Sequence, residues 1–512
     1  MPRDEPSEVL AFLAEHLRAP GAEAPETIQT HISILLLGRD RVYKLKRAIR
    51  LPYLDFSTPG LRLDACRQEV ALNRRTAPAL YLGARRITRE AGGALAFDGL
   101  GELVDAVVEM RRFAEDTLFT RLAQDGRLDR PLLTALARNI AAFHARAERA
   151  SGHDGARRIL DVLELNEQCP DMVPAFGAEA VGALRTALRE SWARHAPLLD
   201  DRARAGKVRR CHGDLHLRNL CLIDGQPTLF DCIEFNESIA TIDVLYDLAF
   251  LLMDLWQAGL RAEANWVMNR YMDESGDTGG LPLLPFFMAL RASIRAQVLS
   301  TQAAMPGAAQ DIVPQARAYL DLAMALLRPV PARLLAIGGL SGSGKSTVAA
   351  AIAHRVGAAP GARIVASDRI RKRIAGVPAE TALPPDSYTR ESSDRVYAAL
   401  EAEAARTLAL GHACIADAVF SRQDERRDIE RRAAEAGAPF LGVWLEADPG
   451  TLVARVRERR NDPSDATADV VLAQVERHTR PRGWLAVQAG KDAAATEAAV
   501  LSAAGIAPDA GC

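Results

Sequence analysis

Residues 339–346 read Gly339-Leu340-Ser341-Gly342-Ser343-Gly344-Lys345-Ser346 and decide the fold of the C-terminal part of the chain. They fit the pattern G-x-x-x-x-G-K-[ST] at every position. An apolar run over 334–338 precedes them and is typical of a buried strand, whereas residues 347–356 favour a helix. Glycines let backbone N–H groups curl round a phosphate, and a helix N-terminus adds partial positive charge. The stretch therefore predicts a phosphate-binding loop between a strand and a helix.

This loop carries separate predicted roles toward ATP and Mg²⁺. Backbone groups from Gly339 to Thr347 are expected to surround the phosphates. Lys345 is expected to reach the β- and γ-phosphates, and Ser346 to ligate Mg²⁺.

Two carboxylates follow later strands, at the edge where ligands of such sheets lie. Asp368 comes after a predicted strand over 362–366 and is the candidate base, with a helix N-cap as the alternative role. Arg371, one helical turn on, is a candidate to hold substrate or phosphate. Asp417 ends a predicted strand over 412–416 and is a candidate Mg²⁺ ligand or substrate-orienting acid, with a plain loop carboxylate as the alternative.

Four arginines crowd the end of a predicted helix over 449–460, namely Arg455, Arg457, Arg459 and Arg460. A solvated basic face explains such a run equally well as a lid that closes over ATP with arginines on the transferred phosphoryl group. Arg455 and Arg459 are favoured for the lid, because residues four apart share one face of a helix.

These motifs resemble the small-molecule and polynucleotide kinases of the P-loop superfamily, over roughly residues 333–490. Gluconate kinase, chloramphenicol phosphotransferase, the zeta-toxin kinases and the 5′-hydroxyl polynucleotide kinases share the plan. The resemblance implies a doubly wound parallel α/β sheet with ATP and Mg²⁺ as cofactors.

A second cluster reads Cys211-His212-Gly213-Asp214-Leu215-His216-Leu217-Arg218-Asn219, and Asp231 follows it. A predicted hairpin over 220–230, with its turn at Asp224-Gly225, brings Asp231 back to the same place. An acid, an amide and a second acid so arranged suit phosphoryl transfer, with Asp214 as base and Asn219 and Asp231 as Mg²⁺ ligands.

This cluster resembles the catalytic loop of aminoglycoside phosphotransferases and choline kinases, which have a bilobal protein-kinase-like α+β fold. The resemblance implies that His212 and Asp247 buttress the loop and that Asp243 belongs to the acidic helix start after it. Upstream, Lys46 is favoured as the ATP-binding lysine with Lys44 as the alternative, and Glu69 is the expected ion-pair partner. Residues 107–110 are the expected adenine-binding hinge strand.

The chain departs from that family between its first two strands, where residues 28–33 contain no glycine. Ser33 and His31 are the candidates to replace the usual phosphate loop. As a whole the chain resembles bacterial proteins in which an aminoglycoside phosphotransferase-like domain is fused to an ATP-binding domain.

Two prolines, Pro329 and Pro331, end a predicted helix over 316–328 and mark the main boundary. Before it, strand-like segments at 30–37, 41–45, 84–88 and 103–110 surround a helix at 62–75, and helices at 129–147, 178–195 and 282–302 follow. The predicted domains are a kinase-like small lobe over 1–113, a helical lobe with the catalytic loop over 114–328, and a P-loop kinase domain over 333–512.

Composition narrows the class of protein further. The chain has 512 residues, 64 Lys and Arg against 66 Asp and Glu, and 48% hydrophobic residues. This near-neutral charge disfavours a nucleic-acid-binding surface without excluding a local basic cleft. Its 7 cysteines include no Cys-x-x-Cys pair, and no apolar run is long enough to span a membrane, which predicts reduced thiols in a cytoplasmic protein.

The leading hypothesis is a bifunctional ATP- and Mg²⁺-dependent kinase whose two domains phosphorylate small hydroxylated molecules. One alternative makes the N-terminal domain a non-catalytic binding or regulatory module. Another makes the P-loop domain a polynucleotide 5′-hydroxyl kinase. The acceptors and the oligomeric state are not specified by any motif.

Overall fold

The computed structural model describes residues 7–18, 24–30, 32–51, 54–305, 309–459, 462–477, 481–490 and 492–506. The chain packs as two compact units. The first comprises Met1–Cys169 and Trp192–Asp254, and the second comprises Pro170–Ser191 and Leu255–Cys512. The three domain ranges predicted from the sequence remain a proposal.

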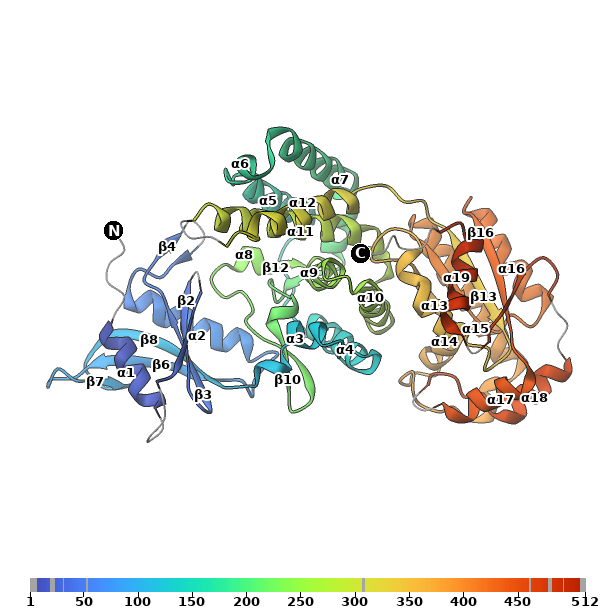
Figure 1. Ribbon diagram of the computed structural model, residues 1–512, viewed down its shortest axis with the longest axis horizontal. Coiled ribbons are helices and arrows are strands. Elements are labelled where there is room, and N and C mark those ends of the chain that lie inside the picture. The colour runs from blue at the N-terminus through green and yellow to red at the C-terminus, as the bar shows by residue number, and fades with distance from the viewer. Residues whose placement is uncertain are drawn as a thin grey trace. The chain divides into compact units, whose positions relative to one another are not determined.

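The first unit contains a six-stranded antiparallel sheet in the order β1-β2-β3-β8-β6-β7 (Figure 1). Its strands are β1 (Glu26–Gln29), β2 (Ser33–Leu37), β3 (Arg41–Lys46), β6 (Tyr81–Arg89), β7 (Leu95–Phe97) and β8 (Glu102–Arg111), and a short pair, β4 (Arg50–Leu51) and β5 (Leu54–Asp55), lies apart. Helices α1 (Ser7–Leu17) and α2 (Pro59–Asn73) precede and interrupt these strands.

The two faces of this sheet bury different helices, because successive strand residues point to opposite sides. Tyr43 and Leu45 pack in one core with Val9 and Leu13 of α1. Val42 lies on the opposite face of the sheet, which packs against α2. Lys44 and Lys46 therefore share the face that carries α2.

The catalytic-loop region of the first unit is built from short strand pairs. β9 (Val208–Arg210) pairs with β12 (Thr241–Asp243), and β10 (Leu220–Ile223) pairs with β11 (Gln226–Leu229). Asp224 and Gly225 both have positive φ at the turn of the second pair. The predicted hairpin is thus confirmed with the predicted turn.

Helices make up most of the chain between residues 115 and 326. They are η1 (Glu115–Thr117), α3 (Phe119–Gln124), α4 (Arg130–Arg146), α5 (Gly155–Glu167), α6 (Met172–Phe176), α7 (Ala178–Arg204), η2 (Leu217–Asn219), α8 (Glu237–Ala240), α9 (Val244–Gln257), α10 (Arg261–Ser275), η3 (Thr278–Leu283), α11 (Leu284–Ala303) and α12 (Ile312–Leu326).

The second unit contains five parallel strands in the order β14-β15-β13-β16-β17. They are β13 (Leu334–Gly339), β14 (Arg363–Ala366), β15 (Cys414–Asp417), β16 (Phe440–Glu446) and β17 (Leu485–Gln488). The helices of this part are α13 (Lys345–Ile352), η4 (Ala353–Arg355), α14 (Ser367–Ile374), η5 (Pro385–Tyr388), α15 (Arg390–Ala409), α16 (Gln423–Glu435), α17 (Pro449–Glu458), α18 (Ala468–Arg477) and α19 (Ala493–Ala503).

Both faces of this parallel sheet are buried, as parallel sheets require. Leu335 and Ile337 of the central strand face a core shared with α13 and α19, and Leu334 and Ala336 face one shared with α15 and α16. This is the predicted doubly wound arrangement.

Several predicted elements have different bounds in the structure, and three of the differences concern the candidate sites. The strand predicted over 30–37 begins only at Ser33, because Thr30 Oγ1 accepts the Ser33 N–H at 2.9 Å and closes a turn between β1 and β2. The helix over 347–356 begins two residues earlier and gives way to a 3₁₀ turn after Ile352. The helix over 449–460 ends at Glu458, since Arg459 adopts extended backbone.

Two general expectations can be compared with the described part of the chain. No helix there is long and apolar enough to cross a membrane. Six cysteines, at positions 66, 169, 211, 221, 232 and 414, are buried free thiols, and Cys512 lies outside the described residues.

The second unit is predicted to lose stability in mild acid through His412. This imidazole is buried next to β15, with Nε2 3.1 Å from Gly361 O, and burial lowers its pKa from 6.5 to about 4. The unfolded chain binds a proton between these pKa values and the folded chain does not. Lowering the pH from 7 to 4 therefore removes on the order of 3 kcal/mol of unfolding free energy at this residue.

Urea unfolding followed by tryptophan fluorescence checks this, because Trp444 and Trp484 lie in the core of the second unit. The variant His412→Gln should lose less stability than the wild type over the same pH range. Equal losses in the two proteins would contradict the assignment.

Candidate active sites

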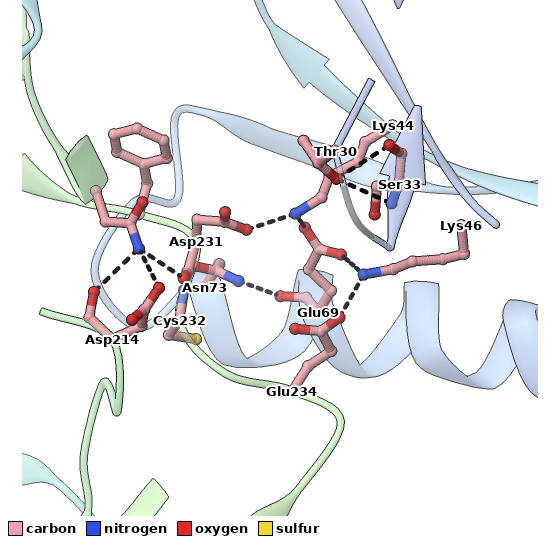
Figure 2. Close-up of polar contacts among 12 residues, drawn as sticks. Thr30, Ser33, Lys44, Lys46, Glu69, Asn73, Asp214, Asp231, Cys232 and Glu234 are labelled. Carbon is pink, nitrogen blue, oxygen red and sulfur yellow. Dashed lines mark hydrogen bonds and ion pairs between the residues drawn. The ribbon is translucent and has the colours of Figure 1, made fainter. Parts of the chain in front are cut away.

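The first candidate site is organised by a buried chain of alternating charges (Figure 2). Lys44 Nζ lies 2.5 Å from Asp231 Oδ1 and 2.8 Å from Glu69 Oε1. Lys46 Nζ lies 2.5 Å from Glu69 Oε2 and pairs on its other side with Glu234. Acids and lysines thus alternate from Asp231 to Glu234, and Glu69 is the shared central carboxylate.

The surrounding charges determine the protonation states of these buried side chains. Burial opposes the charge on Lys44, but the carboxylates of Asp231 and Glu69 outweigh it and hold the pKa of Lys44 well above its ordinary value. Burial likewise opposes ionisation of Glu69, but the two lysines lower its pKa to about 2. Both lysines and Glu69 are therefore charged at neutral pH.

The two lysines differ in what they can reach. Lys46 is fully enclosed, with 0% of its side chain exposed, and both of its partners are buried acids. Lys44 instead contacts Asp231, whose side chain is 41% exposed. The preference for Lys46 as the ATP-binding lysine, which rested on family spacing, does not fit this geometry. We therefore assign that role to Lys44 as a proposal.

The segment that carries Asp231 is held by α2 and β6. Asp231 itself has a φ of +61°, an uncommon conformation for a residue other than glycine. Its N–H donates to Tyr81 Oη at 3.1 Å, and the Cys232 N–H donates to Asn73 Oδ1 at 2.9 Å. Asn73 Nδ2 donates in turn to Glu69 O at 3.0 Å, so one residue of α2 connects the segment of Asp231 and Cys232 to the backbone of Glu69.

The catalytic loop brings the predicted base and amide together. Asn219 Nδ2 donates to Asp214 Oδ2 at 2.8 Å and to Asp214 O at 3.0 Å. His216 Nε2 lies 3.3 Å from the same carboxylate oxygen. Gly213, with a φ of +84°, makes the bend that presents Asp214, which is half-buried.

Asp247 is the main support beneath this loop, as the resemblance implied. Its carboxylate accepts the N–H groups of His212 at 3.1 Å and Gly213 at 2.7 Å and lies 3.0 Å from His144 Nε2. His212 Nε2 lies 2.9 Å from Phe230 O, which links the loop to the hairpin. Asp243, by contrast, forms a buried ion pair with Arg202.

Three supporting residues escaped the sequence analysis. Asp254 Oδ2 accepts the Leu217 N–H at 3.0 Å at the far end of the loop. Glu234 and Asn73 hold the charge chain and the segment after it. Only Glu234 could have been predicted from the sequence, because an acid three residues after Asp231 on a buried segment requires a cation nearby.

The turn without glycine lies between β1 and β2. Thr30 and Ser33 close it with two hydrogen bonds, and Ser33 Oγ is buried with no hydrogen-bond partner among the described residues. Within the described part of the chain, the Ser33 hydroxyl therefore has no partner at the turn where the sequence predicted a phosphate contact. His31, the other predicted replacement, lies outside the described residues.

The second candidate site surrounds the loop between β13 and α13. Gly342 and Gly344 have φ values of +87° and +90°, and a side chain at Gly342 would collide with the backbone of Leu452. Lys345 Nζ folds back and donates to Leu340 O at 3.1 Å. The loop thus has the left-handed turns that phosphate binding needs.

The two predicted acids gather at the same loop. Asp417 interacts with the hydroxyl of Ser346, and burial raises its pKa against the opposing charge of Lys345. Asp368 interacts with the hydroxyl of Ser464, and burial raises its pKa as well. Sequence-distant Ser346 and Asp417 thus form one oxygen-rich pair suited to Mg²⁺.

The three predicted arginines have distinct surroundings. Arg371 is buried by its contacts with the Ser387 carbonyl, at 2.7 Å, and the Tyr388 ring. Arg455 donates to the carbonyls of Ala489 at 3.2 Å and Gly490 at 2.5 Å, beyond β17. Arg371 and Arg455 are therefore held by protein groups.

Arg459, like Arg455, whose Nη1 atom lies 3.5 Å from Gly342 O, is near the loop. Its charge acts on Lys345, and its Nη1 atom is buried without a hydrogen-bond partner among the described residues. The shared helix face proposed for Arg455 and Arg459 is wrong, because Arg459 lies past the end of α17. Arg460 lies outside the described residues, and Arg457 is exposed.

Gln474 is a further contact that the sequence did not reveal. This α18 side chain accepts the Ser341 N–H of the loop at 2.9 Å through Oε1. A glutamine on an amphipathic helix has no distinguishing spacing, so only the structure could identify it.

Comparisons with known proteins match the two candidate sites to two separate family models. Residues 56–270 match the model of the Phosphotransferase enzyme family, and residues 334–481 match that of an AAA domain. An uncharacterized protein of Mycobacterium tuberculosis is 29% identical over 463 residues, which cover 88% of this chain and 89% of that protein.

Two other similar proteins each cover part of the chain. An adenylyl-sulfate kinase of Myxococcus xanthus is 29% identical over 124 residues, which are 24% of this chain and 62% of that protein. The crystal structure of a choline/ethanolamine kinase family protein from Mesorhizobium loti is 14% identical and covers 63% of this chain and 94% of that chain, with a TM-score of 0.38.

Removing Lys46 is predicted to destabilise the first unit more than removing Lys44. Lys46→Met leaves buried Glu234 without its ion-pair partner, a change that costs about 3–5 kcal/mol in comparable buried pairs. Lys44→Met costs less, because Glu69 keeps Lys46 and Asp231 is partly exposed to water.

Urea unfolding followed by circular dichroism measures both variants. The double variant Lys46→Met/Glu234→Gln should recover part of the loss, since it removes the unpaired charge. The assignment fails if Lys44→Met is the more destabilising of the two.

Proposed function

We propose that both sites transfer the γ-phosphoryl group of ATP to a hydroxyl of a small molecule. The premise is that this chain joins a domain of the phosphotransferase enzyme family, at 56–270, to a P-loop kinase domain of the AAA type, at 334–481. The observation that carries the proposal is a convergence seen in each site. A base, an oxygen-donor pair for Mg²⁺ and a lysine come together from separate segments of the chain.

In the first site, Asp214 is the proposed base. The acceptor hydroxyl gives its proton to Asp214 while its oxygen bonds to the γ-phosphorus and ADP leaves. The amide of Asn219 and the imidazole of His216 orient the carboxylate. Lys44, held by Glu69, is the proposed grip on the phosphates.

Asn219 and Asp231 fit a Mg²⁺ ion in this site, because both offer oxygen ligands beside Asp214. When bound, Mg²⁺ would neutralise the negative charge that develops on the phosphate oxygens. The unpartnered Ser33 hydroxyl supports a phosphate contact from the β1–β2 turn.

In the second site, Asp368 is the proposed base. Its raised pKa makes the carboxylate a better proton acceptor for a hydroxyl, and the Ser464 hydroxyl fixes its orientation. Lys345 and Arg459 are the proposed phosphate grips, and Ser346 and Asp417 would hold Mg²⁺. Arg371 and Arg455 are proposed to shape the site rather than to contact the phosphoryl group, since protein carbonyls occupy their guanidinium groups.

Separate inactivation of the two sites by substitution tests the proposal. Asp214→Ala should abolish phosphoryl transfer at the first site only, and Lys345→Ala at the second only. The measurement is labelled-phosphate transfer from ATP to a metabolite panel, with product identification by mass spectrometry.

The same panel distinguishes other readings of the chain. Loss of all transfer in Lys345→Ala, with none in Asp214→Ala, would make the first domain a non-catalytic module. Transfer to a 5′-hydroxyl oligonucleotide, rather than to metabolites, would make the second domain a polynucleotide kinase.

The lysine assignment has its own kinetic prediction. Lys44→Met should lower first-site turnover by about a hundredfold or more, because it removes a preorganised cation from the developing phosphate charge. Lys46→Met, measured below its unfolding midpoint, should keep a larger share of activity. The reverse order of the two variants would restore Lys46 as the ATP-binding lysine.

A further inference from the structure

The free edge of the parallel sheet is covered by a helix encoded before the P-loop sequence. β14 is the last strand of the sheet. The Arg363 N–H bonds to Ala413 O, at 2.9 Å, on the side of β15. Because alternate residues of a parallel strand bond to opposite sides, Ile364 N–H and Ala362 O face the open edge. Such an edge is left unpaired unless another element covers it.

Asn269 of α10 pairs with both of these edge groups. Its Oδ1 atom accepts the Ile364 N–H at 2.7 Å, and its Nδ2 atom donates to Ala362 O at 3.1 Å. One side-chain amide thus makes the two hydrogen bonds that a neighbouring strand would make.

This amide is fixed from behind. Asn269 is 0% exposed, and its Nδ2 atom also lies 3.0 Å from Asn265 Oδ1. Asn265 Nδ2 donates to Ala362 O at 3.1 Å and to Pro360 O at 3.0 Å. The orientation of the Asn269 amide is therefore determined by buried groups on both sides.

Asp273, one turn further along α10, gathers the arginines that flank the strand. It lies 2.6 Å from Arg363 Nη2 and 3.4 Å from Arg369 Nη1. Arg270 of its own helix contributes a third guanidinium at 3.1 Å. Arg363 is 1% exposed and has a second carboxylate, Glu403, at 2.8 Å.

Along the sequence, these contacts lie on both sides of Asp368, the proposed base. Asn269 accepts the N–H of Ile364, four residues before Asp368. Asp273 forms an ion pair with Arg369, the residue directly after Asp368. Among the described residues, the hydrogen bonds and ion pairs of Asn269 and Asp273 do not involve the phosphate loop at 339–347.

We propose that Asn269 and Asp273 are positioning residues for the second site, which set the placement of Asp368 through β14 and the start of α14. This rests on the proposed kinase function of that site. Asn269 lies within the match to the phosphotransferase family at 56–270, and Asp273 lies just after its end. Both residues of α10 thereby complete the acceptor side of the P-loop domain. Nucleotide binding depends on the other strand, β13, and its loop.

The test uses the full chain with Asp214→Ala, so that only the second site turns over. Asn269→Leu removes the amide at similar volume, and Asp273→Asn removes the charge without a change of size. Asn139→Leu is the matched control, because its amide donates to a backbone carbonyl, Pro227 O, at 2.8 Å within the first unit. Asp273→Glu is the conservative rescue.

Two measurements separate positioning from stability. The first is the split between kcat for Mg·ATP hydrolysis and Kd for Mg·ADP. We expect kcat to fall by about tenfold to a hundredfold in Asn269→Leu and Asp273→Asn, since displacement of a reacting group by about 1 Å has effects of that size. The Kd should stay at the control value, and Asp273→Glu should regain most of the kcat.

The second measurement is amide hydrogen exchange by mass spectrometry, which needs no activity. Exchange should accelerate in peptides covering 362–372 and stay unchanged in those covering 334–350. Unchanged exchange over 362–372, or a kcat equal to that of Asn139→Leu, overturns the proposal. A wild type that hydrolyses no ATP would defeat the proposed kinase function, and the exchange result would still decide the role of α10. If Asn269→Leu does not fold, Asp273→Asn carries both measurements.

Discussion

A charge is costly to bury without an opposite partner, and two buried ion-pair clusters that meet this constraint support the candidate sites. In the first unit, Glu69 can be buried only because Lys44 and Lys46 approach it from one face of β3. In the second, Arg363 can be buried only because Asp273 and Glu403 meet it. The first cluster includes Lys44, the proposed phosphate-binding lysine. The second includes Arg363 of β14, the strand that precedes Asp368.

The two sites solve the same chemical problem with different backbones. The first places its base and oxygen ligands on a loop and a hairpin, and supports them from beneath with Asp247 and Asp254. The second places its acids after parallel strands and its lysine in a glycine loop whose positive φ values exclude other residues. Among the described residues, both sites leave a polar atom without a hydrogen-bond partner where phosphate is proposed to bind, Ser33 Oγ in the first and Arg459 Nη1 in the second.

Much of this could be predicted because the motifs are local. The hairpin turn at Asp224-Gly225 and the strand, loop and helix at 334–352 are encoded by glycine positions and apolar runs, which act over a few residues. Other choices depended on groups far away in the sequence. Lys44 and Lys46 share a face and a partner, and only the place of Asp231 separates them. Arg455 and Arg459 have equivalent positions in the sequence pattern, but α17 ends between them, so only Arg455 is on the helix.

The sequence by itself determined the two kinds of catalytic motif, their order and the residue types that each site uses, because these follow from spacing along the chain. The tertiary structure alone decided which side chains support them. The pairing of Asn269 with an open strand edge, the contact of Gln474 with the phosphate loop and the ion pair of Lys46 with Glu234 join residues far apart in sequence. Such contacts depend on burial and on which polar groups remain unpaired after the backbone has folded, and no local pattern records either.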